Sequence, residues 1–570
     1  MQNDALKNLD KIRLNQDPKL AEEQITAIIF YLTTFGYIDG EFDDHERQFL
    51  RSQIHGIVQN RFGGPSSLEQ DFVQKQLTHY NEVLEQLDQQ IKDFFEEVVA
   101  DGESVEEFVI AKLKLRCYEI FKSFPEEDRR VLLDTVDDFI NADGVAHPNE
   151  VKFRNELAEL FSAEILVGLE EFEILEHQPL SIDSTPELPI PIQENHPFFS
   201  ESEQHYARDP ELRRKQAIAD YNLLDLVLER FEEQRANATG KLNGVQHIND
   251  FAGQEPFLDG HVYVHPLKPN QPCEVLVFGD LHGCYSCLKA GLLQFDFFNK
   301  VKAFHDDPEK NPDVKVILLG DYIDRGKFSY NGVLRTVLRL FMEAPNHVYV
   351  LRGNHEYYIE HEGKIYGGVK PAEAINTLSP YMPKKMFEAY MKFFDAMPNM
   401  LFFGESLFVH AGIPRDELFK ERYKDLSSLN DPDIRFQMLW SDPSPVDHVP
   451  ADLQRQSARF PFGRKQFKAF MNRVGANLMV RGHEKVEEGF KQVFAEQDAV
   501  LLSLFSSGGE DNDDLPLQSS YRSVKPKGLI ISYKNGDTNI TPIELDYAKY
   551  NDPKHNAFFQ KPAEIFHRAE

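Results

Sequence analysis

The stretch VLVFGDLHG, from Val275 to Gly283, guides the interpretation of the rest of the chain. Its four leading apolar residues predict a buried strand, and Gly279 ends that strand. Asp280 and His282 follow, two residues apart, at the strand end. A carboxylate oxygen and an imidazole nitrogen presented together are suitable ligands for one divalent metal ion. The stretch therefore predicts a strand that ends in a metal-binding pair.

The same pattern occurs at four further places. Each is an apolar run that ends in a polar side chain: VKVILLGDYIDRG delivers Asp321, HVYVLRGNHE delivers Asn354 and His355, LFVHAG delivers His410, and LMVRGHE delivers His483. A single Asp-x-His occurs often by chance, but recurrence makes the pattern specific. In α/β sheets, ligand sites gather at the carboxyl ends of strands. We therefore expect these side chains to converge on one site.

Length and charge limit the classes of protein that fit. A chain of 570 residues exceeds one hydrophobic core, so two or three domains are expected. A net charge of −32 without a long basic run argues against a nucleic-acid or anionic-membrane binder. No apolar run approaches the roughly 18 residues needed to span a bilayer, and the first residues carry no secretory signal. Four cysteines suit a reducing compartment, so a cytoplasmic location is expected.

Residues 1–175 are predicted to be helical, because their apolar residues recur at helical spacing. Asp39-Gly40 followed by Glu46, and Asp143-Gly144 followed by Glu150, form an internal repeat with equal spacing. The region resembles the TerB-like helical domain of tellurite-resistance proteins, which has been linked to metal binding. Simple helix capping is the alternative explanation: each glutamate could occupy the third position of a new helix.

Residues 176–248 separate this region from the next. The segment 176–203 is rich in proline and predicts an extended linker. A connector helix is expected after it, and the sequence leaves open which neighbour that helix packs on. The next domain, with a C-terminal extension, is expected over 249–570.

Six motifs then occur in order: GDLHG, GDYIDRG, RGNHE, HAG, LWSDP and RGHE. In this order they resemble the phosphoprotein phosphatases, the metal-dependent serine/threonine protein phosphatases of the calcineurin-like metallophosphoesterase superfamily. The resemblance implies an αββα sandwich preceded by the all-α domain. It also implies two metal ions, with Asp280, His282 and Asp321 holding the first and Asp321, Asn354, His410 and His483 holding the second. The mixed nitrogen and oxygen ligands favour Mn, Fe or Zn.

Roles can also be predicted for the other motif residues. His355 could protonate the leaving alkoxide, and Asp324 could orient its imidazole. Arg325 offers a planar fork to phosphate oxygens, and Asn354 is a further phosphate-binding candidate. The family carries a second phosphate-binding arginine shortly before an F-x-F-G segment. Here Arg459 and Arg455 both precede Phe460-Pro461-Phe462-Gly463; we favour Arg459. The family's tyrosine-containing loop is replaced by the acidic run Leu504 to Asp514, which leaves peptide selectivity open.

Three functions remain in consideration. A serine/threonine phosphoprotein phosphatase is preferred, with a phosphoprotein or small phosphoester as substrate and a possible regulatory partner bound by the helical domain. Symmetrical dinucleoside tetraphosphate hydrolases share GD-x-HGCY but usually lack the aspartate matching Asp324 and read GNHD where this chain has Glu356. A phosphate-sensing scaffold without catalysis would need a lost ligand or acid, and none is lost. Nuclease-type relatives usually end in G-H-x-H, whereas Lys485 follows Glu484 here.

Overall fold

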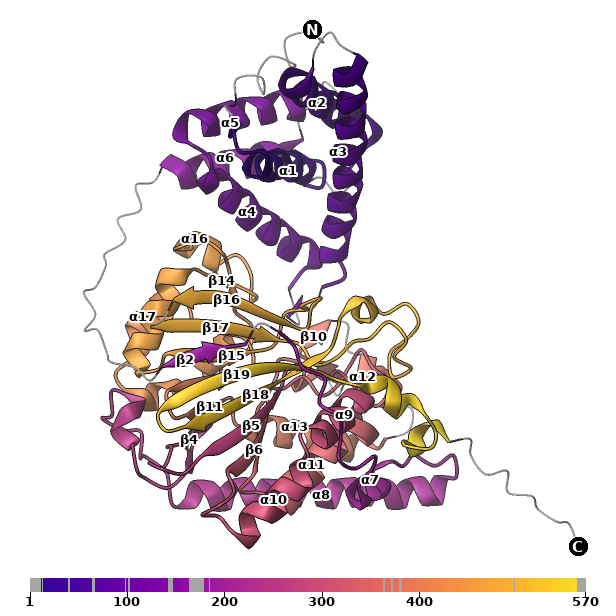
Figure 1. The fold of residues 1–570 in the computed structure, drawn as a ribbon, viewed down its shortest axis with the longest axis vertical. Helices are drawn as coiled ribbons and strands as arrows, with labels where there is room; N and C mark the ends of the chain where they lie inside the picture. The colour runs from indigo at the N-terminus through magenta and orange to yellow at the C-terminus, as the bar shows by residue number, and fades with distance from the viewer. Residues whose placement is uncertain are drawn as a thin grey trace, which may run out of the picture. The chain divides into compact units, whose positions relative to one another are not determined.

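The computed structural model describes residues 12, 14–38, 42–63, 67–97, 99–100, 103–141, 147–162, 179–183, 185–361, 364–370, 373–378, 382–496 and 498–560. The chain divides into two compact units. The first contains residues 1–170 with the short segment 452–457, and the second contains residues 171–451 and 458–570. Figure 1 shows the fold along the chain. No helix in the described ranges is long and apolar enough to cross a membrane.

The first unit is helical, as the sequence predicts. Its described residues form α1 (Pro18–Phe35), α2 (Asp44–Phe62), α3 (Ser67–Phe94), α4 (Val105–Ser123), α5 (Glu126–Ile140) and α6 (Pro148–Ser162), together with a two-residue strand β1 (Val99–Ala100). The helices bury aromatic side chains in one core, where Tyr31 packs edge-on against Phe35 and Phe121. Such aromatic pairs add to the free energy gained from area burial.

The two repeated glutamates of this unit cap helices. The Asp43 side chain accepts the amide of Glu46, whose carboxylate accepts the amide of Asp43, each at 2.8 Å. The Glu150 carboxylate likewise accepts the His147 amide at 3.1 Å. Reciprocal bonds of this kind satisfy amides at a helix start that have no partner inside the helix. The two Asp-Gly turns lie outside the described residues, so the TerB-like resemblance stays a prediction.

The second unit contains two large sheets. The seven-stranded sheet has the order β16 (Phe490–Glu496), β17 (Ala499–Leu504), β15 (Leu478–Arg481), β12 (Ser406–Val409), β11 (Met400–Phe403), β4 (Val262–His265) and β3 (Phe257–Asp259). The six-stranded sheet has the order β2 (Leu180–Ile182), β19 (Asp537–Glu544), β18 (Lys527–Lys534), β5 (Cys273–Phe278), β6 (Asp313–Leu318) and β7 (Val348–Val350). β5, β6 and β7 are parallel, as are β12, β15 and β17.

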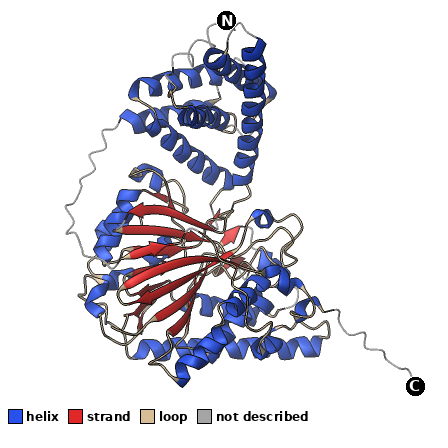
Figure 2. Ribbon diagram, in the orientation of Figure 1, coloured by secondary structure: helices blue, strands red, loops and turns tan. Residues whose placement is uncertain are grey.

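Helices cover the outer faces of both sheets (Figure 2). The α-helices of this unit between residues 197 and 474 are α7 (Pro197–Ser202), α8 (Pro210–Ala236), α9 (Tyr285–Gln294), α10 (Phe297–Asp306), α11 (Arg335–Glu343), α12 (Glu373–Leu378), α13 (Lys384–Ala396), α14 (Asp416–Arg422), α15 (Pro432–Met438) and α17 (Arg464–Val474); α16 (Ala451–Gln454) falls mostly in the segment 452–457 of the first unit. Short strands complete the unit: β8 (Tyr358–His361), β9 (Lys364–Gly367), β10 (Val369–Lys370), β13 (Asp442–Pro443) and β14 (Pro461–Phe462).

Side chains that alternate along a strand face different layers of the sandwich. On β11, Leu401 and Phe403 belong to the core between the sheets, whereas Met400 and Phe402 belong to a second core beneath α15 and α17. Alternate residues of a strand point to opposite faces, so one apolar strand joins both cores. This confirms the predicted αββα sandwich.

The segment between the predicted domains differs from the expectation. Instead of an extended linker, β2 pairs in parallel with β19, and Glu187 bridges to Ile543 farther along the same strand. Proline is tolerated beside an edge strand because one side of that strand has no ladder partner, so a proline-rich sequence does not by itself predict a linker. The connector helix α8 also belongs to the second unit, since Leu224, Val227 and Phe231 are buried in its core.

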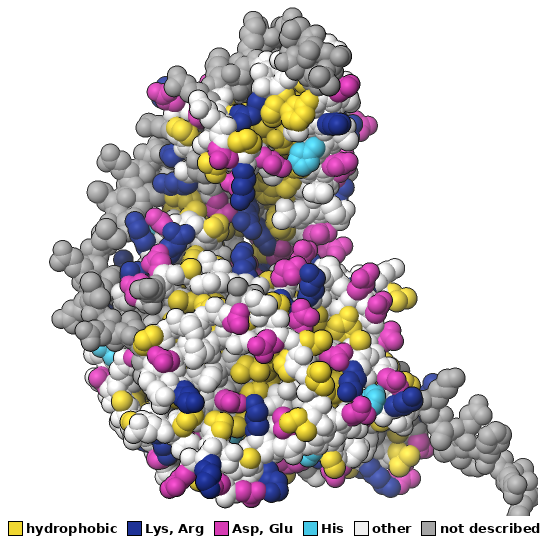
Figure 3. All heavy atoms as spheres, viewed as in Figure 1, with side chains coloured by type: hydrophobic (Ala, Val, Ile, Leu, Met, Phe, Trp, Pro, Cys, Tyr) yellow, Lys and Arg dark blue, Asp and Glu magenta, His cyan; other side chains and the backbone are white. Residues whose placement is uncertain are grey.

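Over the face of the second unit seen in Figure 3, lysine and arginine side chains are scattered among aspartates and glutamates. On this face the cations do not form the clustered basic surface that electrostatic binding of nucleic acid uses.

Candidate metal centre

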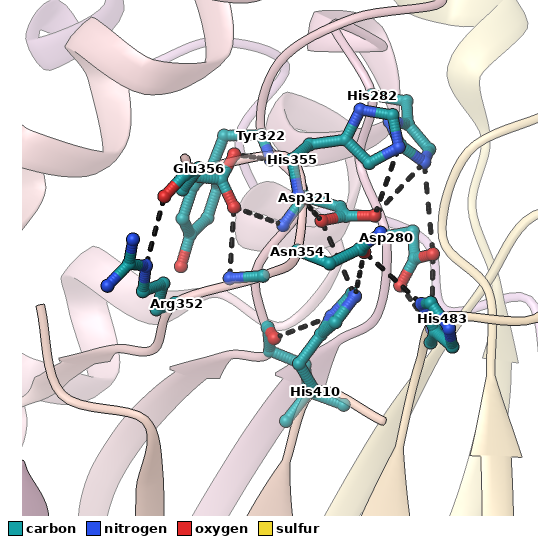
Figure 4. A network of polar contacts seen from close by, with 12 residues as sticks. Asp280, His282, Asp321, Tyr322, Arg352, Asn354, His355, Glu356, His410 and His483 are labelled. Atoms are coloured by element: carbon teal, nitrogen blue, oxygen red, sulfur yellow. Dashed lines mark hydrogen bonds and ion pairs between the residues drawn. The ribbon is translucent and has the colours of Figure 1, made fainter. Parts of the chain in front are cut away.

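Five strand ends bring the predicted ligands together. Asp280 and His282 follow β5, Asp321 follows β6, Asn354 and His355 follow β7, His410 follows β12 and His483 follows β15. The first three strands are neighbours in one sheet, and β12 and β15 are neighbours in the other. Figure 4 shows the side chains pointing toward one another. All seven are buried, with at most 9% of any residue exposed.

Asp321 lies at the middle of this group. Its Oδ2 is 3.4 Å from His282 Nε2, and its Oδ1 is 3.4 Å from His410 Nε2. Two sets of side chains therefore share this carboxylate: His282, Asp321 and His355 in one, and Asp280, Asp321 and His410 in the other, with the ligand atoms of each set within 4.8 Å of one another. A carboxylate whose two oxygens face different ligand sets can bridge two metal ions.

Asn354 and His483, predicted as ligands of the second ion, lie beside the second set; Asp280 belongs to this set too, whereas the sequence placed it with His282 at the first ion. The side-chain amide of Asn354 lies 2.8 Å from His410 Nε2 and 3.2 Å from His483 Nδ1. The backbone amide of His483 donates to Asp280 Oδ1 at 2.9 Å. The buried Nε2 of His483 has no hydrogen-bond partner among the described residues. A buried polar atom of this kind costs free energy unless something else satisfies it.

Two histidines are oriented by backbone carbonyls. His282 Nδ1 donates to the Ile323 carbonyl at 2.9 Å, and His410 Nδ1 donates to the Leu319 carbonyl at 3.1 Å. This leaves the Nε2 lone pair of each ring facing the site. Metal-binding histidines are commonly fixed in this way, because the bond at one nitrogen sets the tautomer at the other.

Burial shapes the charges of the ligands. Burial raises the pKa of Asp280 to about 7, and burial together with the charges of Asp280 and Glu356 raises the pKa of Asp321 well above its usual value. Burial also lowers the pKa of His282 and His410 well below 6.5, so both rings are neutral and able to act as ligands. Cations would stabilise this site, because they would offset the cost of ionising the buried carboxylates. The residues therefore fit two divalent ions.

Unusual backbone geometry is concentrated here. His282, Asp321 and His483 adopt positive φ values of 41°, 55° and 70°. A Cβ on Gly353 would lie 2.1 Å from Asp321 Oδ1, and one on Gly482 would lie 2.1 Å from Asp280 Oδ1. These motif glycines are needed because the ligand carboxylates approach the backbone closely. Strain of this kind is typical of functional sites.

Glu356 has a supporting role that the sequence did not reveal. Its carboxylate accepts the amides of Asp321 and Tyr322 at 2.8 Å and of Gly353 at 3.0 Å. The Arg352 guanidinium donates to the Glu356 carbonyl at 3.0 Å, as Figure 4 shows. One buried carboxylate thus ties together the loops after β6 and β7. The one sequence signal for this role is that Glu356 directly follows Asn354 and His355.

His355 is oriented by Asp324. Its Nδ1 lies 2.6 Å from Asp324 Oδ2, and Asp324 Oδ1 accepts the Ala374 amide at 2.6 Å. The other ring nitrogen, Nε2, lies 3.8 Å from Asp321 Oδ2. This geometry fits a proton donor held by a carboxylate, and it also places the ring where it could bind a metal ion.

The arginines differ in position. Arg325 Nη1 lies 2.7 Å from Glu373 Oε1, and Arg459 Nε donates to Asp442 Oδ2 at 2.9 Å. The charge of Arg459 contributes to lowering the pKa of both His355 and His483, whose main cause is burial. Arg455 is instead half-exposed and pairs with Asp452, three residues earlier. The structure therefore brings Arg325 and Arg459 to the site.

A tyrosine beside the site was missed in the sequence. The Tyr521 ring lies 5.3 Å from the ring of His282 and 5.1 Å from that of Phe505. Tyr521 lies seven residues after the end of the acidic run, outside the loop in which the resemblance leads one to expect a tyrosine. In that run, Asp514 is buried and accepts the Ser286 amide at the start of α9, so this carboxylate anchors the loop.

Comparisons with known proteins agree with this geometry. The model of the calcineurin-like phosphoesterase family matches residues 274–487. A probable serine/threonine-protein phosphatase of Encephalitozoon cuniculi is 27% identical over 257 residues, which are 44% of this chain and 50% of that protein. The match thus spans about half the length of that relative.

Solved structures are also similar in part. A protein serine/threonine phosphatase from Saccharomyces cerevisiae is 17% identical, covering 57% of this chain and 90% of its own, with a TM-score of 0.37. A purple acid phosphatase from yellow lupin is 13% identical, covering 50% of this chain and 56% of its own, with a TM-score of 0.23.

The sandwich and its paired ligand sets lie largely within the residues that the family model matches. Residues 274–487 are thus similar to the calcineurin-like phosphoesterases in sequence, and the arrangement of the ligand sets agrees with that similarity.

Proposed function

We propose that this protein is a metal-dependent phosphatase that removes phosphate from serine and threonine residues of proteins. The observation that supports it most is that two ligand sets share Asp321 beside the His355–Asp324 pair. Phosphate monoesters are hydrolysed very slowly without a catalyst. When bound, two divalent ions would polarise the phosphoryl group and lower the pKa of a water molecule.

The protein's own groups complete the chemistry. Arg325 and Arg459 bind phosphoryl oxygens, because a guanidinium matches two oxygens at once. The Glu373 carboxylate contacts Arg325 at 2.7 Å, and the phosphate of the substrate takes its place. In its protonated form His355 donates the Nε2 proton to the departing serine or threonine oxygen; Asp324 holds Nδ1 and stabilises that charged form against the burial that lowers the ring's pKa. Asn354, between His410 and His483, assists in binding the phosphate.

Similarity to the Encephalitozoon protein supports the choice of phosphoprotein substrates. Asp324 and Glu356, which most dinucleoside tetraphosphate hydrolases of this superfamily lack, favour the same choice. We further propose that the helical unit binds a regulatory partner or a substrate protein and adds no chemistry. Its two repeated glutamates already serve as caps.

The experiment compares substrates on one preparation. With Mn²⁺ added, the full chain should hydrolyse phosphoserine and phosphothreonine peptides and p-nitrophenyl phosphate faster than diadenosine tetraphosphate. Faster cleavage of the dinucleotide would contradict the protein-phosphatase assignment. Absence of turnover on every substrate by metal-loaded, folded protein would favour the phosphate-sensing scaffold.

A further inference from the structure

A cavity of about 600 Å³ lies at the other end of the central strands from the metal centre. Its wall includes Cys273 of β5, Asp313 and Lys315 of β6, Tyr349 of β7 and Tyr263 and His265 of β4. Asp321 lies six residues after Lys315, past the end of β6 at Leu318, so at about 3.3 Å per residue the two places are up to about 20 Å apart. The cavity is therefore separate from the proposed active site.

The inner face of β6 changes from polar to apolar along the strand. Asp313, Lys315 and Ile317 are alternate residues and point to the same side, toward the other sheet. Ile317 is in the core between the sheets, whereas Lys315 carries a charge although it is only 4% exposed. Central parallel strands normally carry continuous apolar runs, since both faces are covered. A charge costs free energy when it is buried there, so folding alone does not explain Lys315.

Most polar groups of this wall have partners within the protein, but the Lys315 ammonium is only partly used. The Lys315 ammonium has three donors, and its one hydrogen-bond partner among the described residues is Asp313 Oδ1, at 2.7 Å. His265 Nδ1 lies 2.5 Å from the Tyr349 hydroxyl, and His347 Nε2 lies 3.2 Å from His305 Nε2. Donors of the lysine therefore remain for an occupant of the cavity.

Three lysines (Lys241, Lys268 and Lys315) and three carboxylates (Glu233, Glu255 and Asp313) line the cavity, so attraction for an anion depends on the unused donors of the buried Lys315. Burial, together with the charge of Lys315, lowers the pKa of His265 to about 3 and lowers the pKa of His347. Both imidazoles are therefore neutral at pH 7 and add no positive charge to the wall. An anion would gain a charge-assisted hydrogen bond, which is about twice as strong as a neutral one.

Aromatic residues form the rest of the wall. The Tyr263 and Tyr349 rings meet edge-on with centroids 5.0 Å apart, and Phe257 and Phe304 also line the space. A volume of this size lies within the range of about 300–1,000 Å³ typical of small-molecule sites, which combine apolar walls with a few placed polar groups.

We propose that this cavity binds a small organic anion, whose carboxylate or phosphate group meets Lys315 and whose flat ring packs against the aromatic wall. The site takes one molecule and is independent of the phosphatase assignment.

Calorimetric titration of the full chain tests the proposal. The probes are 4-hydroxybenzoate for a carboxylate and adenosine monophosphate for a phosphate, with phenol and adenosine as their neutral counterparts. At least one anion should bind with a Kd below about 1 mM and more tightly than its neutral counterpart. The anion that binds identifies the charged group. The proposal is overturned if neither anion binds, or if the neutral counterpart binds equally well.

Variants locate the binding. Lys315→Met should weaken it about 10- to 100-fold, the effect of losing a hydrogen bond to a charged group. Lys302→Met is the matched control, since Lys302 is an exposed lysine of α10 paired with Asp306, and it should bind as the wild type does. Equal binding by Lys315→Met would place the anion elsewhere, including at the metal centre, and would contradict the proposal.

His305→Ala is a second variant. It should fold, because His305 is exposed on α10. It should weaken binding about 2- to 10-fold, as expected for one neutral hydrogen bond. If Lys315→Met does not fold by circular dichroism, this variant decides the test, and unchanged binding to it overturns the proposal.

Discussion

Acidic residues recur in both units of this protein, but their surroundings differ. Asp280 and Asp321 come from separate strands and are buried together with four histidines. Glu46 and Glu150 each bond an amide three residues away, at the start of their own helix. Acidic residues that converge from separate strands therefore indicate a binding site. Acidic residues that each accept an amide at the start of their own helix indicate helix capping.

Truncation is the strongest way to test whether the units are independent. A fragment of residues 171–570 should fold and hydrolyse p-nitrophenyl phosphate, because it keeps α8 and β2. A fragment of residues 249–570 should not fold, since it loses Leu224, Val227 and Phe231 from the core. Each such loss costs about 2–5 kcal/mol, against a total stability of about 5–15 kcal/mol.

Circular dichroism and turnover measure this difference. If the shorter fragment is folded and active, α8 is a detachable connector. If the longer fragment is folded, metal-loaded and inactive, the helical unit supplies part of the active site.

Replacement of His355 separates chemistry from metal binding. His355→Ala should keep its metal and lower turnover about 10²–10⁴-fold, the usual range for a lost general acid. His45→Ala, at an exposed histidine of α2, should change neither quantity. Elemental analysis decides the role: a metal-free His355→Ala protein would make His355 a ligand.

Arginine variants test the assignment of the phosphate contacts. Arg325→Ala and Arg459→Ala should each lower kcat/KM about 10- to 100-fold, the effect of losing charge-assisted hydrogen bonds. Arg455→Ala is the matched control and should behave as the wild type, because its side chain is half-exposed and paired with Asp452. Equal losses at Arg455 and Arg459 would refute the choice between them.

Cap variants give the smallest expected effect. Glu46→Ala should destabilise the helical unit by about 0.5–1 kcal/mol, measured by urea unfolding, and leave turnover unchanged. Glu82→Ala, in the middle of α3, should be close to neutral. Loss of bound metal in Glu46→Ala would show that the repeat is more than a pair of caps.

The apolar runs predicted the convergence of the ligands, because each run ends directly before its ligand, whereas the sandwich was implied by the resemblance to the phosphoprotein phosphatases. The sequence could not predict contacts made between distant loops. Glu356 accepts three amides from neighbouring loops, and the Tyr521 ring lies beside His282 although Tyr521 is seven residues past the acidic run. β2 was missed because an edge strand needs only one partner, so its proline-rich sequence resembled a linker.

Metal content and turnover, measured together on the wild type and Asp321→Asn, test the central claim most directly. Because Asp321 faces both ligand sets, the wild type should hold about two ions per chain, and the variant should lose both along with turnover. Chelation should likewise abolish wild-type hydrolysis of p-nitrophenyl phosphate, and Mn²⁺ should restore it. Full turnover in a demonstrably metal-free sample, or in metal-depleted Asp321→Asn, would contradict the account.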